Sequence, residues 1–131
     1  VEDGKGNVLL QQRAANLKVS PLKWTCAAAG TVVGSDSYKD TAIRELKEEI
    51  GIDATDLQEG NIVFCRSSFG WRYSQGYIIV CDYPIEKFTI QEEELAQLKW
   101  FDKKTVMREI DGGDTKYAST ASIYRQLFNL G

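Results

Sequence analysis

The sequence has no histidine, only two prolines and only three cysteines. Without histidine there is no Ser-His-Asp triad, no Cys-His dyad and no zinc site with a histidine ligand. Polar chemistry is therefore left to carboxylate, lysine, arginine, tyrosine and hydroxyl groups. Cys26, Cys65 and Cys81 are odd in number, widely spaced and free of any Cys-x-x-Cys pair. We interpret them as buried, unreactive thiols of a protein in the reducing cytoplasm.

Long apolar runs and an excess of positive charge are also missing. No apolar run is long enough for a membrane span or for the core of a signal peptide. The formal net charge of -3 over 131 residues gives no general attraction to nucleic acid or anionic membranes, so we expect neither as a partner. The length fits one domain, 1–131. Because the sequence opens with Val as if inside a hairpin, we expect further residues of this domain upstream of Val1.

The spacing of apolar residues predicts a mixed α/β domain. Alternating or continuous apolar residues predict strands at 8–13, 24–28, 62–66, 76–83 and 98–101, with 67–75 as a loop or hairpin. Helical spacing predicts a helix from Ser37 to Ile50, capped by Ser35, Asp36 or Ser37 and ended by Gly51. Two shorter helices are expected, one capped by Asp102 and one over 123–128.

Three glutamates stand out on the first predicted helix. Glu45, Glu48 and Glu49 are spaced i, i+3 and i+4, which places them on one helical face. Their charges repel each other unless a cation is shared, and ligands that are all oxygen suit Mg²⁺ or Mn²⁺ better than zinc. A Glu-rich face is also common as simple solvated surface, so the helix alone leaves both interpretations open.

The residues around these glutamates favour the metal site. Gly30, Asp36 and the segment 44–52 resemble the Nudix box, G-x5-E-x7-R-E-U-x-E-E-x-G-U, where U is aliphatic. Asp36 stands where the box has Glu, and every other specified position matches. The resemblance implies an α/β fold, the Nudix-type α/β/α sandwich with a mixed β-sheet.

The resemblance also assigns roles by matching position. It implies that Glu45, Glu48 and Glu49 are ligands of Mg²⁺ (or Mn²⁺) and that Arg44 orients the region of Glu45. The structural positions of the box are Gly30, Asp36, Leu46, Gly51 and Ile52. Asp36 is one methylene shorter than Glu but still acidic at a helix start, where the helix dipole favours negative charge, so we expect little loss.

The activity that the resemblance implies is hydrolysis of a phosphoanhydride bond in a nucleoside diphosphate-linked or other small diphosphate compound, by metal-activated water. Glu48, Glu49 and Arg44 are then the catalytic residues of the box. Family members often place a further base outside it, for which Glu93 or Glu94 is the candidate. The alternative for the run 92–94 is a solvated loop before a strand.

Contacts to substrate are less clearly marked in the sequence. Arg13 and Lys23 flank the predicted catalytic loop, and Trp71 and Arg72 lie in an aromatic-rich segment that can stack a base and reach phosphate. Alternating aromatics on a hairpin are also typical of packing. The sequence leaves the oligomeric state open, with a homodimer as the candidate because dimers are the commonest oligomers.

Two alternatives remain open at this point. The segment 24–30 is similar to the isopentenyl diphosphate isomerase branch of the Nudix fold, which has a catalytic Cys immediately before the box glycine and several metal-binding His. Here Ala29 takes the Cys position, Cys26 lies three residues earlier and no His exists, so isomerase chemistry is not expected. The other alternative is a Nudix-like module that senses a nucleotide without cleaving it, but the glutamates of the box favour catalysis.

Overall fold

The computed structural model describes residues 1–29, 32–54, 57–67 and 70–118, with the side chains of 63–72 outside the description. The helices and strands follow in the order β1 (Asn7–Arg13), β2 (Trp24–Cys26), α1 (Tyr38–Ile50), β3 (Gln58–Ser67), β4 (Gly70–Ile78), the 3₁₀ turn η1 (Ile85–Lys87), β5 (Leu95–Asp102) and α2 (Lys103–Asp111). The predicted helix over 123–128 lies outside the described residues.

Most predicted elements are confirmed, and one strand is misplaced. The sequence predicts a strand at 76–83, whereas β4 begins at Gly70, takes up all of the segment 70–75 and ends at Ile78. The reason lies in the pairing: β4 forms a hairpin with β3 whose register runs from Gln58↔Ile78 to Ser67↔Gly70. Beyond Ile78 the chain leaves β3, and backbone groups of Ile79 and Cys81 bond to Glu2 instead.

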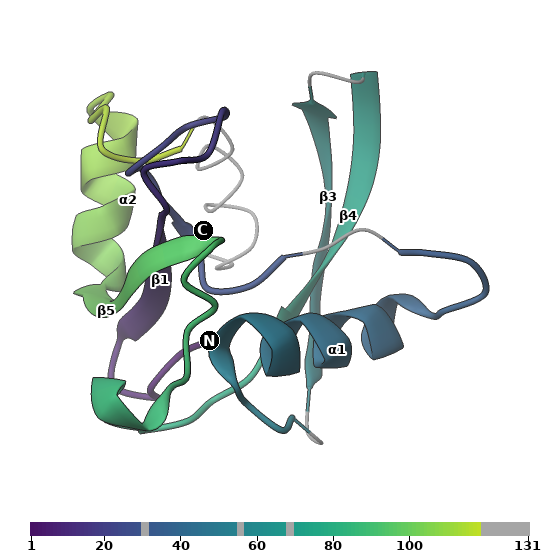
Figure 1. Ribbon diagram of the computed structural model, residues 1–131. Coiled ribbons are helices and arrows are strands. Elements are labelled where there is room, and N and C mark those ends of the chain that lie inside the picture. The colour runs from purple at the N-terminus through teal and green to yellow at the C-terminus, as the bar shows by residue number, and fades with distance from the viewer. Residues whose placement is uncertain (30–31, 55–56, 68–69, 119–131) are drawn as a thin grey trace.

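The strands form two antiparallel sheets (Figure 1). One sheet has the order β2-β1-β5 and the other is the β3–β4 hairpin. Among the described residues, parallel pairing occurs in the isolated bridges Glu2↔Val80 and Trp24↔Tyr117. The α/β fold class is confirmed.

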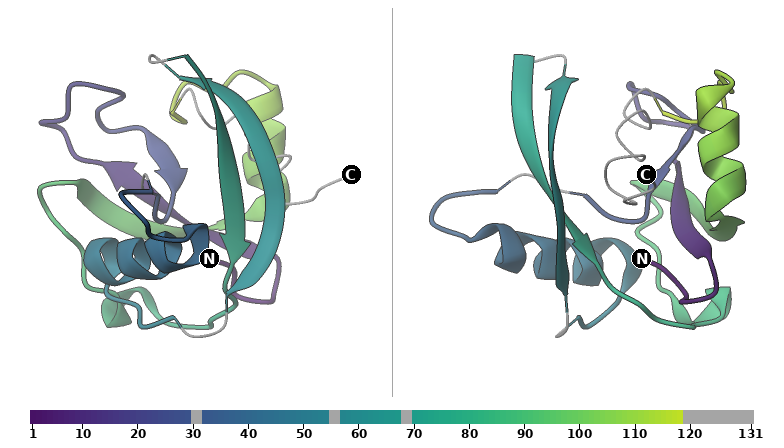
Figure 2. Two further views of the ribbon diagram at one scale, coloured as in Figure 1. Left: turned by 90° about the vertical axis from the view of Figure 1, so that its right-hand side faces the viewer. Right: turned by 180° about the vertical axis from the view of Figure 1, so that it is seen from behind.

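The alternation of β1 explains how the layers pack, because successive side chains of a strand point to opposite faces. Leu9 packs with Leu46 and Ile50 of α1. Val8 and Leu10 belong to a second cluster, with Val106 and Met107 of α2. The two helices therefore cover opposite faces of the three-stranded sheet (Figures 1 and 2).

Both ends of α1 are capped by side-chain and backbone groups. Of the three predicted caps it is Ser37 whose hydroxyl accepts the Asp40 N–H, at 3.0 Å. Gly51 adopts a left-handed conformation, with φ of 74°, and its N–H donates to the Lys47 carbonyl at 3.1 Å. These caps fix the glutamate-bearing segment. No helix in the described parts of the chain has the length and apolar character needed to cross a membrane.

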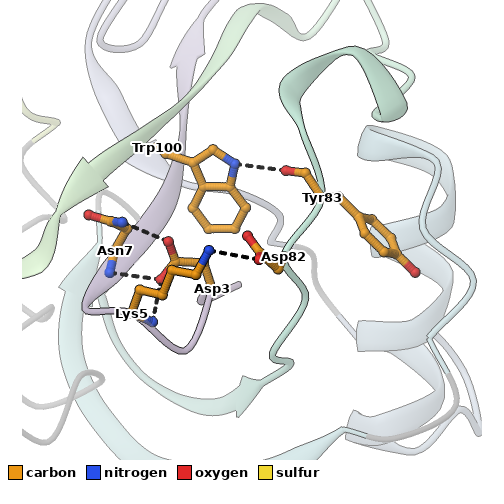
Figure 3. Close-up of polar contacts among 6 residues, drawn as sticks. All are labelled: Asp3, Lys5, Asn7, Asp82, Tyr83 and Trp100. Carbon is orange, nitrogen blue, oxygen red and sulfur yellow. Dashed lines mark hydrogen bonds and ion pairs between the residues drawn. The ribbon is translucent and has the colours of Figure 1, made fainter.

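A polar turn holds the start of the chain against the segment that follows β4 (Figure 3). The Asp3 carboxylate accepts hydrogen bonds from the Lys5 N–H at 2.7 Å and from the Asn7 side-chain amide at 2.6 Å. The Lys5 ammonium pairs with Asp82 at 2.9 Å. The turn therefore ties the N-terminal residues to the segment after β4.

Candidate active site

The carboxylates of α1 differ in their surroundings. The Glu45 side chain is only 19% exposed, whereas Glu48 is exposed. Burial raises the pKa of Glu45, and the negative charges of Glu48 and Glu94 raise it further against the opposing effect of Arg44. Glu45 thus lies in a negative environment that a cation would relieve.

Glu49 is held by hydrogen bonds from two other parts of the chain. Its Oε2 accepts the backbone N–H of Ala29 at 3.2 Å and faces the Gln11 Nε2 at 3.5 Å. Gln11 is 6% exposed, and the same nitrogen donates to the Ala27 carbonyl at 2.9 Å. The loop after β2 is therefore joined through β1 to the last turn of α1.

Gln11 is not among the residues that the sequence predicts for the site. The available signal was its position two residues after Leu9, on the face of β1 that turns toward α1, where a polar side chain must find a partner. The Ala29 N–H was not predicted either, because every residue except proline has a backbone N–H and the residue type does not show which one donates.

The Glu49 carboxyl has a pKa raised to about 7. Burial is the main cause, the Ala29 hydrogen bond works against it, and the charges of Glu45 and Glu94 raise the pKa further. A carboxyl that titrates near neutral pH is suited to accept a proton from water.

Glu94 approaches the helix from outside the box. The segment 89–95 is bonded to the end of α1: the Thr89 N–H donates to the Ile50 carbonyl at 3.1 Å and the Gln91 N–H to the Glu49 carbonyl at 3.2 Å. The charge of Glu94 acts on both Glu45 and Glu49. Of the two candidates Glu93 and Glu94, it is therefore Glu94 that the structure associates with the helix.

Arg44 connects the departure from the box pattern to the glutamates. Its Nη1 pairs with Asp36 Oδ2 at 2.5 Å, and its Nη2 lies 3.8 Å from Glu45 Oε1. The shorter side chain of Asp36 thus reaches the arginine. Leu46 and Ile52 are buried in the core, and Gly30 lies outside the described residues.

Two of the predicted substrate contacts, Arg13 and Lys23, bond to backbone carbonyls of the chain. The Arg13 Nε donates to the Val19 carbonyl at 3.0 Å, and the Lys23 ammonium donates to the Thr115 carbonyl. The side chains of Arg13 and Lys23 therefore each form a hydrogen bond to the backbone of another segment of the chain. The side chains of Trp71 and Arg72 lie outside the described part, and their backbone belongs to β4.

Residues 1–121 match the family model of the NUDIX domain. The chain belongs to the Nudix family. The uncharacterized Nudix hydrolase lin0387 of Listeria innocua is 29% identical over 104 residues, which cover 76% of this chain and 58% of that protein. The chain therefore spans less than two thirds of that relative.

Solved structures show the same Nudix fold. DR0079 from Deinococcus radiodurans superposes with a TM-score of 0.79 at 15% identity, covering 97% of this chain and 78% of that one. The NUDIX domain of Shewanella oneidensis NrtR, in complex with ADP ribose, gives a TM-score of 0.61 at 22% identity, covering 78% of this chain and 66% of that one.

The donor chemistry of this Nudix box fits a hard divalent cation. Glu45, Glu48 and Glu49 offer only carboxylate oxygens. Burial raises the pKa of Glu45, and the negative charge of Glu48 raises it further. Among the described residues, no three or more acidic or cysteine side chains are arranged to hold a metal ion. Binding would therefore require these side chains to move together, and the ligand set stays a prediction.

The cysteines give no support to isomerase chemistry. Ala29 stands at the position of the isomerase cysteine, and its backbone N–H donates a hydrogen bond to the Glu49 carboxylate. The Cys26 thiol, three residues earlier, has a pKa raised mainly by burial, and the Cys81 thiol has a pKa raised by burial as well. Raised pKa values disfavour the thiolate, which is the reactive form.

Proposed function

We propose that this Nudix domain hydrolyses a phosphoanhydride bond in a nucleoside diphosphate-linked or other small diphosphate compound. Water attacks one phosphorus atom, the bridging P–O bond breaks, and the two products each end in a phosphate group. The observation that carries the proposal is Glu49, a box glutamate with a pKa near 7 beside Glu45 and Glu94. Its position in a family of hydrolases supports the reaction class.

Glu49 is the proposed general base of the box. Its carboxylate takes a proton from the attacking water while the Ala29 N–H keeps one of its oxygens in place. Glu94 is the proposed auxiliary base, since its charge already acts on Glu49. Arg44, fixed by Asp36, orients Glu45.

The proposed metal ligands are Glu45, Glu48 and Glu49. Bound Mg²⁺ or Mn²⁺ supplies charge neutralisation of the diphosphate and lowers the pKa of water. The four side chains Glu45, Glu48, Glu49 and Glu94 carry more negative charge than Arg44 balances, so without such a cation a diphosphate would be repelled.

ADP ribose is the first substrate to test, because it is bound to the structurally similar NrtR domain. We would incubate the protein with ADP ribose, a nucleoside triphosphate, a dinucleoside polyphosphate and a coenzyme diphosphate, each with Mg²⁺ or Mn²⁺, and quantify the products by chromatography. The proposal expects cleavage of at least one compound. We expect Glu49→Gln to lower its turnover by at least 100-fold, whereas Glu86→Gln, an exposed residue of η1, leaves it unchanged.

The same experiment separates hydrolysis from sensing. Tight binding of a nucleotide with no cleavage of any compound would identify a sensing module and reject the proposal. The cytoplasm remains the expected location. The oligomeric state stays open, and sedimentation of the purified protein checks whether it is a homodimer.

A further inference from the structure

The candidate active site continues into a cavity of about 490 Å³ beside the glutamate helix. Ala29 and Glu45 of the site are among its lining residues, and so are two tyrosines, Tyr38 and Tyr73. Its lining is largely apolar, as is usual where a protein binds the uncharged part of a small ligand. A substrate held at the glutamates has this cavity as the space for the group beyond its diphosphate.

One side of α1 connects the glutamates to Tyr38. Positions 38, 42, 45 and 49 are spaced i, i+4, i+7 and i+11, so they follow one another along the same side of the helix. Ala42, between Tyr38 and Glu45, is small and also lines the cavity. Seven residues of helix separate Tyr38 from Glu45 by about 10 Å along the axis. This span is comparable to a phosphate and a ribose placed end to end.

Tyr73 borders the same cavity from β4, which passes α1 and rises beyond it (Figures 1 and 2). Tyr73 and Tyr77 are four residues apart on this strand and therefore share a face. Burial is the main cause of the raised pKa of Tyr77, and Tyr38 is one of the neighbouring groups that raise it further. This face of β4 is therefore turned toward the start of α1.

Both tyrosines keep most of their surface in contact with solvent. Tyr38 is 57% exposed and Tyr73 is 68% exposed, whereas Tyr117, which packs in the core, is 5% exposed. Aromatic rings at the wall of a site bind a flat ring by stacking, and such a contact strengthens the binding of a base roughly tenfold. The two rings therefore present stacking surface to a ligand in the cavity.

The charges along the cavity restrict what such a ligand carries. Among the described lining residues the charged side chains are those of Glu2 and Glu45, and none of these residues is a lysine or an arginine. An additional phosphate in the cavity would meet negative charge with no cation to balance it. An uncharged ring is compatible with this lining.

We propose that Tyr38 and Tyr73 determine the specificity of the site by stacking on the uncharged ring of a nucleoside whose ribose carries no additional phosphate. The arrangement rests on the proposed function, which places the diphosphate at the glutamates. The ribose then spans the stretch beside Ala42, and the diphosphate reaches Glu45. The two tyrosines bind the substrate and take no part in the transfer of protons.

Nucleosides without phosphate test the ring contact in the absence of metal and turnover. We would titrate adenosine and cytidine separately into the 131-residue chain and follow the ring protons of Tyr38 and Tyr73 by NMR. At least one nucleoside should shift both rings, and its Kd should rise by roughly fivefold or more in Tyr38→Leu and in Tyr73→Leu. The variants Tyr38→Phe and Tyr73→Phe keep the ring and should stay within about twofold of the parent.

Tyr83→Leu is the matched control, because Tyr83 is 44% exposed and lies outside the described lining of the cavity. We expect it to leave the Kd unchanged. Absence of shifts at both tyrosines with either nucleoside would overturn the proposal. Equal Kd values in the parent and in both leucine variants would also overturn it. Because Tyr38 and Tyr73 are exposed, the leucine variants should fold, and their Tm values check this.

Kinetics on the compound that the screen shows to be cleaved give a second test. Each leucine variant should raise its KM by roughly tenfold and leave kcat within about twofold, because stacking contributes to ground-state binding. ADP ribose with an extra phosphate on its adenosine ribose should be a poorer substrate than ADP ribose. Cleavage only of diphosphates without an aromatic ring, or preference for the extra phosphate, would contradict the proposal.

Failure of the proposed function gives a different result from failure of this specificity assignment. If no compound is cleaved but the nucleoside still loses affinity in both leucine variants, the tyrosine contact stands without hydrolysis. If a compound is cleaved with an unchanged KM in both leucine variants, hydrolysis stands and the tyrosine contact is rejected.

Discussion

The backbone N–H of Ala29 and the carboxylate of Glu49 form a hydrogen bond of 3.2 Å across 20 residues of sequence. The bond joins the loop after β2 to the last turn of α1. It also opposes the effect of burial on Glu49, because a donor to the ionised carboxylate favours its charged form. The position of the loop and the protonation of Glu49 are therefore coupled.

The first prediction concerns the stability of the metal-free protein against pH. The folded pKa of Glu49, about 7, lies above its ordinary value of 4.5, so the folded state holds this proton more tightly. The contribution of the protonated Glu49 carboxyl to the free energy of unfolding is therefore full below pH 4.5 and is lost as the pH rises through 7. We expect Glu49→Gln to be more stable than the parent at pH 8 by about 1–2 kcal/mol, a value reduced for partial solvent screening. Urea unfolding with EDTA measures this, and a parent as stable as the variant at pH 8 contradicts it.

The second prediction concerns Gln11. Gln11→Leu leaves the buried Ala27 carbonyl without this donor and removes the contact to Glu49, which should cost about 1–3 kcal/mol of stability. Gln11→Glu adds a negative charge beside Glu49 and should move the acidic limb of the pH–activity profile upward. Gln97→Glu, at an exposed position of β5, is the control. An unshifted profile for Gln11→Glu would show that Gln11 does not act on Glu49.

The third prediction concerns the end of the glutamate helix. In Gly51→Ala the new Cβ would lie 3.0 Å from the Thr89 Cβ, at a backbone φ of +74°. Gly34→Ala is a matched control, because its φ is +64° but no neighbouring atom of the described residues lies within 4 Å of the added Cβ. We expect Gly34→Ala to cost about 1 kcal/mol and Gly51→Ala to cost more, by thermal unfolding. An equal or larger loss at Gly34 would mean that the contact with Thr89 is unimportant.

The fourth prediction concerns the one departure from the box pattern. Asp36→Glu keeps a carboxylate for Arg44, so turnover should stay within about twofold of the parent. Asp36→Ala should lower turnover by about tenfold through loss of Arg44 orientation, yet cost less than about 1 kcal/mol of stability, since the pair is partly exposed. Steady-state kinetics and urea unfolding are compared for both variants. Loss of stability without loss of turnover in Asp36→Ala would leave Arg44 a structural role only.

The sequence was sufficient for local structure with strong periodic or capping signals. The helix Tyr38–Ile50 and its two caps follow from apolar spacing, Ser37 and Gly51. The strand β4 was misplaced, because Trp71 and Tyr73 alternate equally well in a loop or a hairpin and only pairing with β3 decides. The Ala29–Glu49 bond depends on how β1, β2 and α1 pack, which residue spacing along the chain does not determine.

If the proposed reaction occurs at the glutamate helix, water attacks phosphorus there. Hydrolysis of the substrate found in the compound screen, carried out in ¹⁸O-labelled water and followed by mass spectrometry, measures where the water oxygen goes. We expect one labelled oxygen in one of the two phosphate products per turnover, and loss of labelling in Glu49→Gln but not in Glu86→Gln. Label in neither phosphate product, or undiminished labelling in Glu49→Gln, would contradict it.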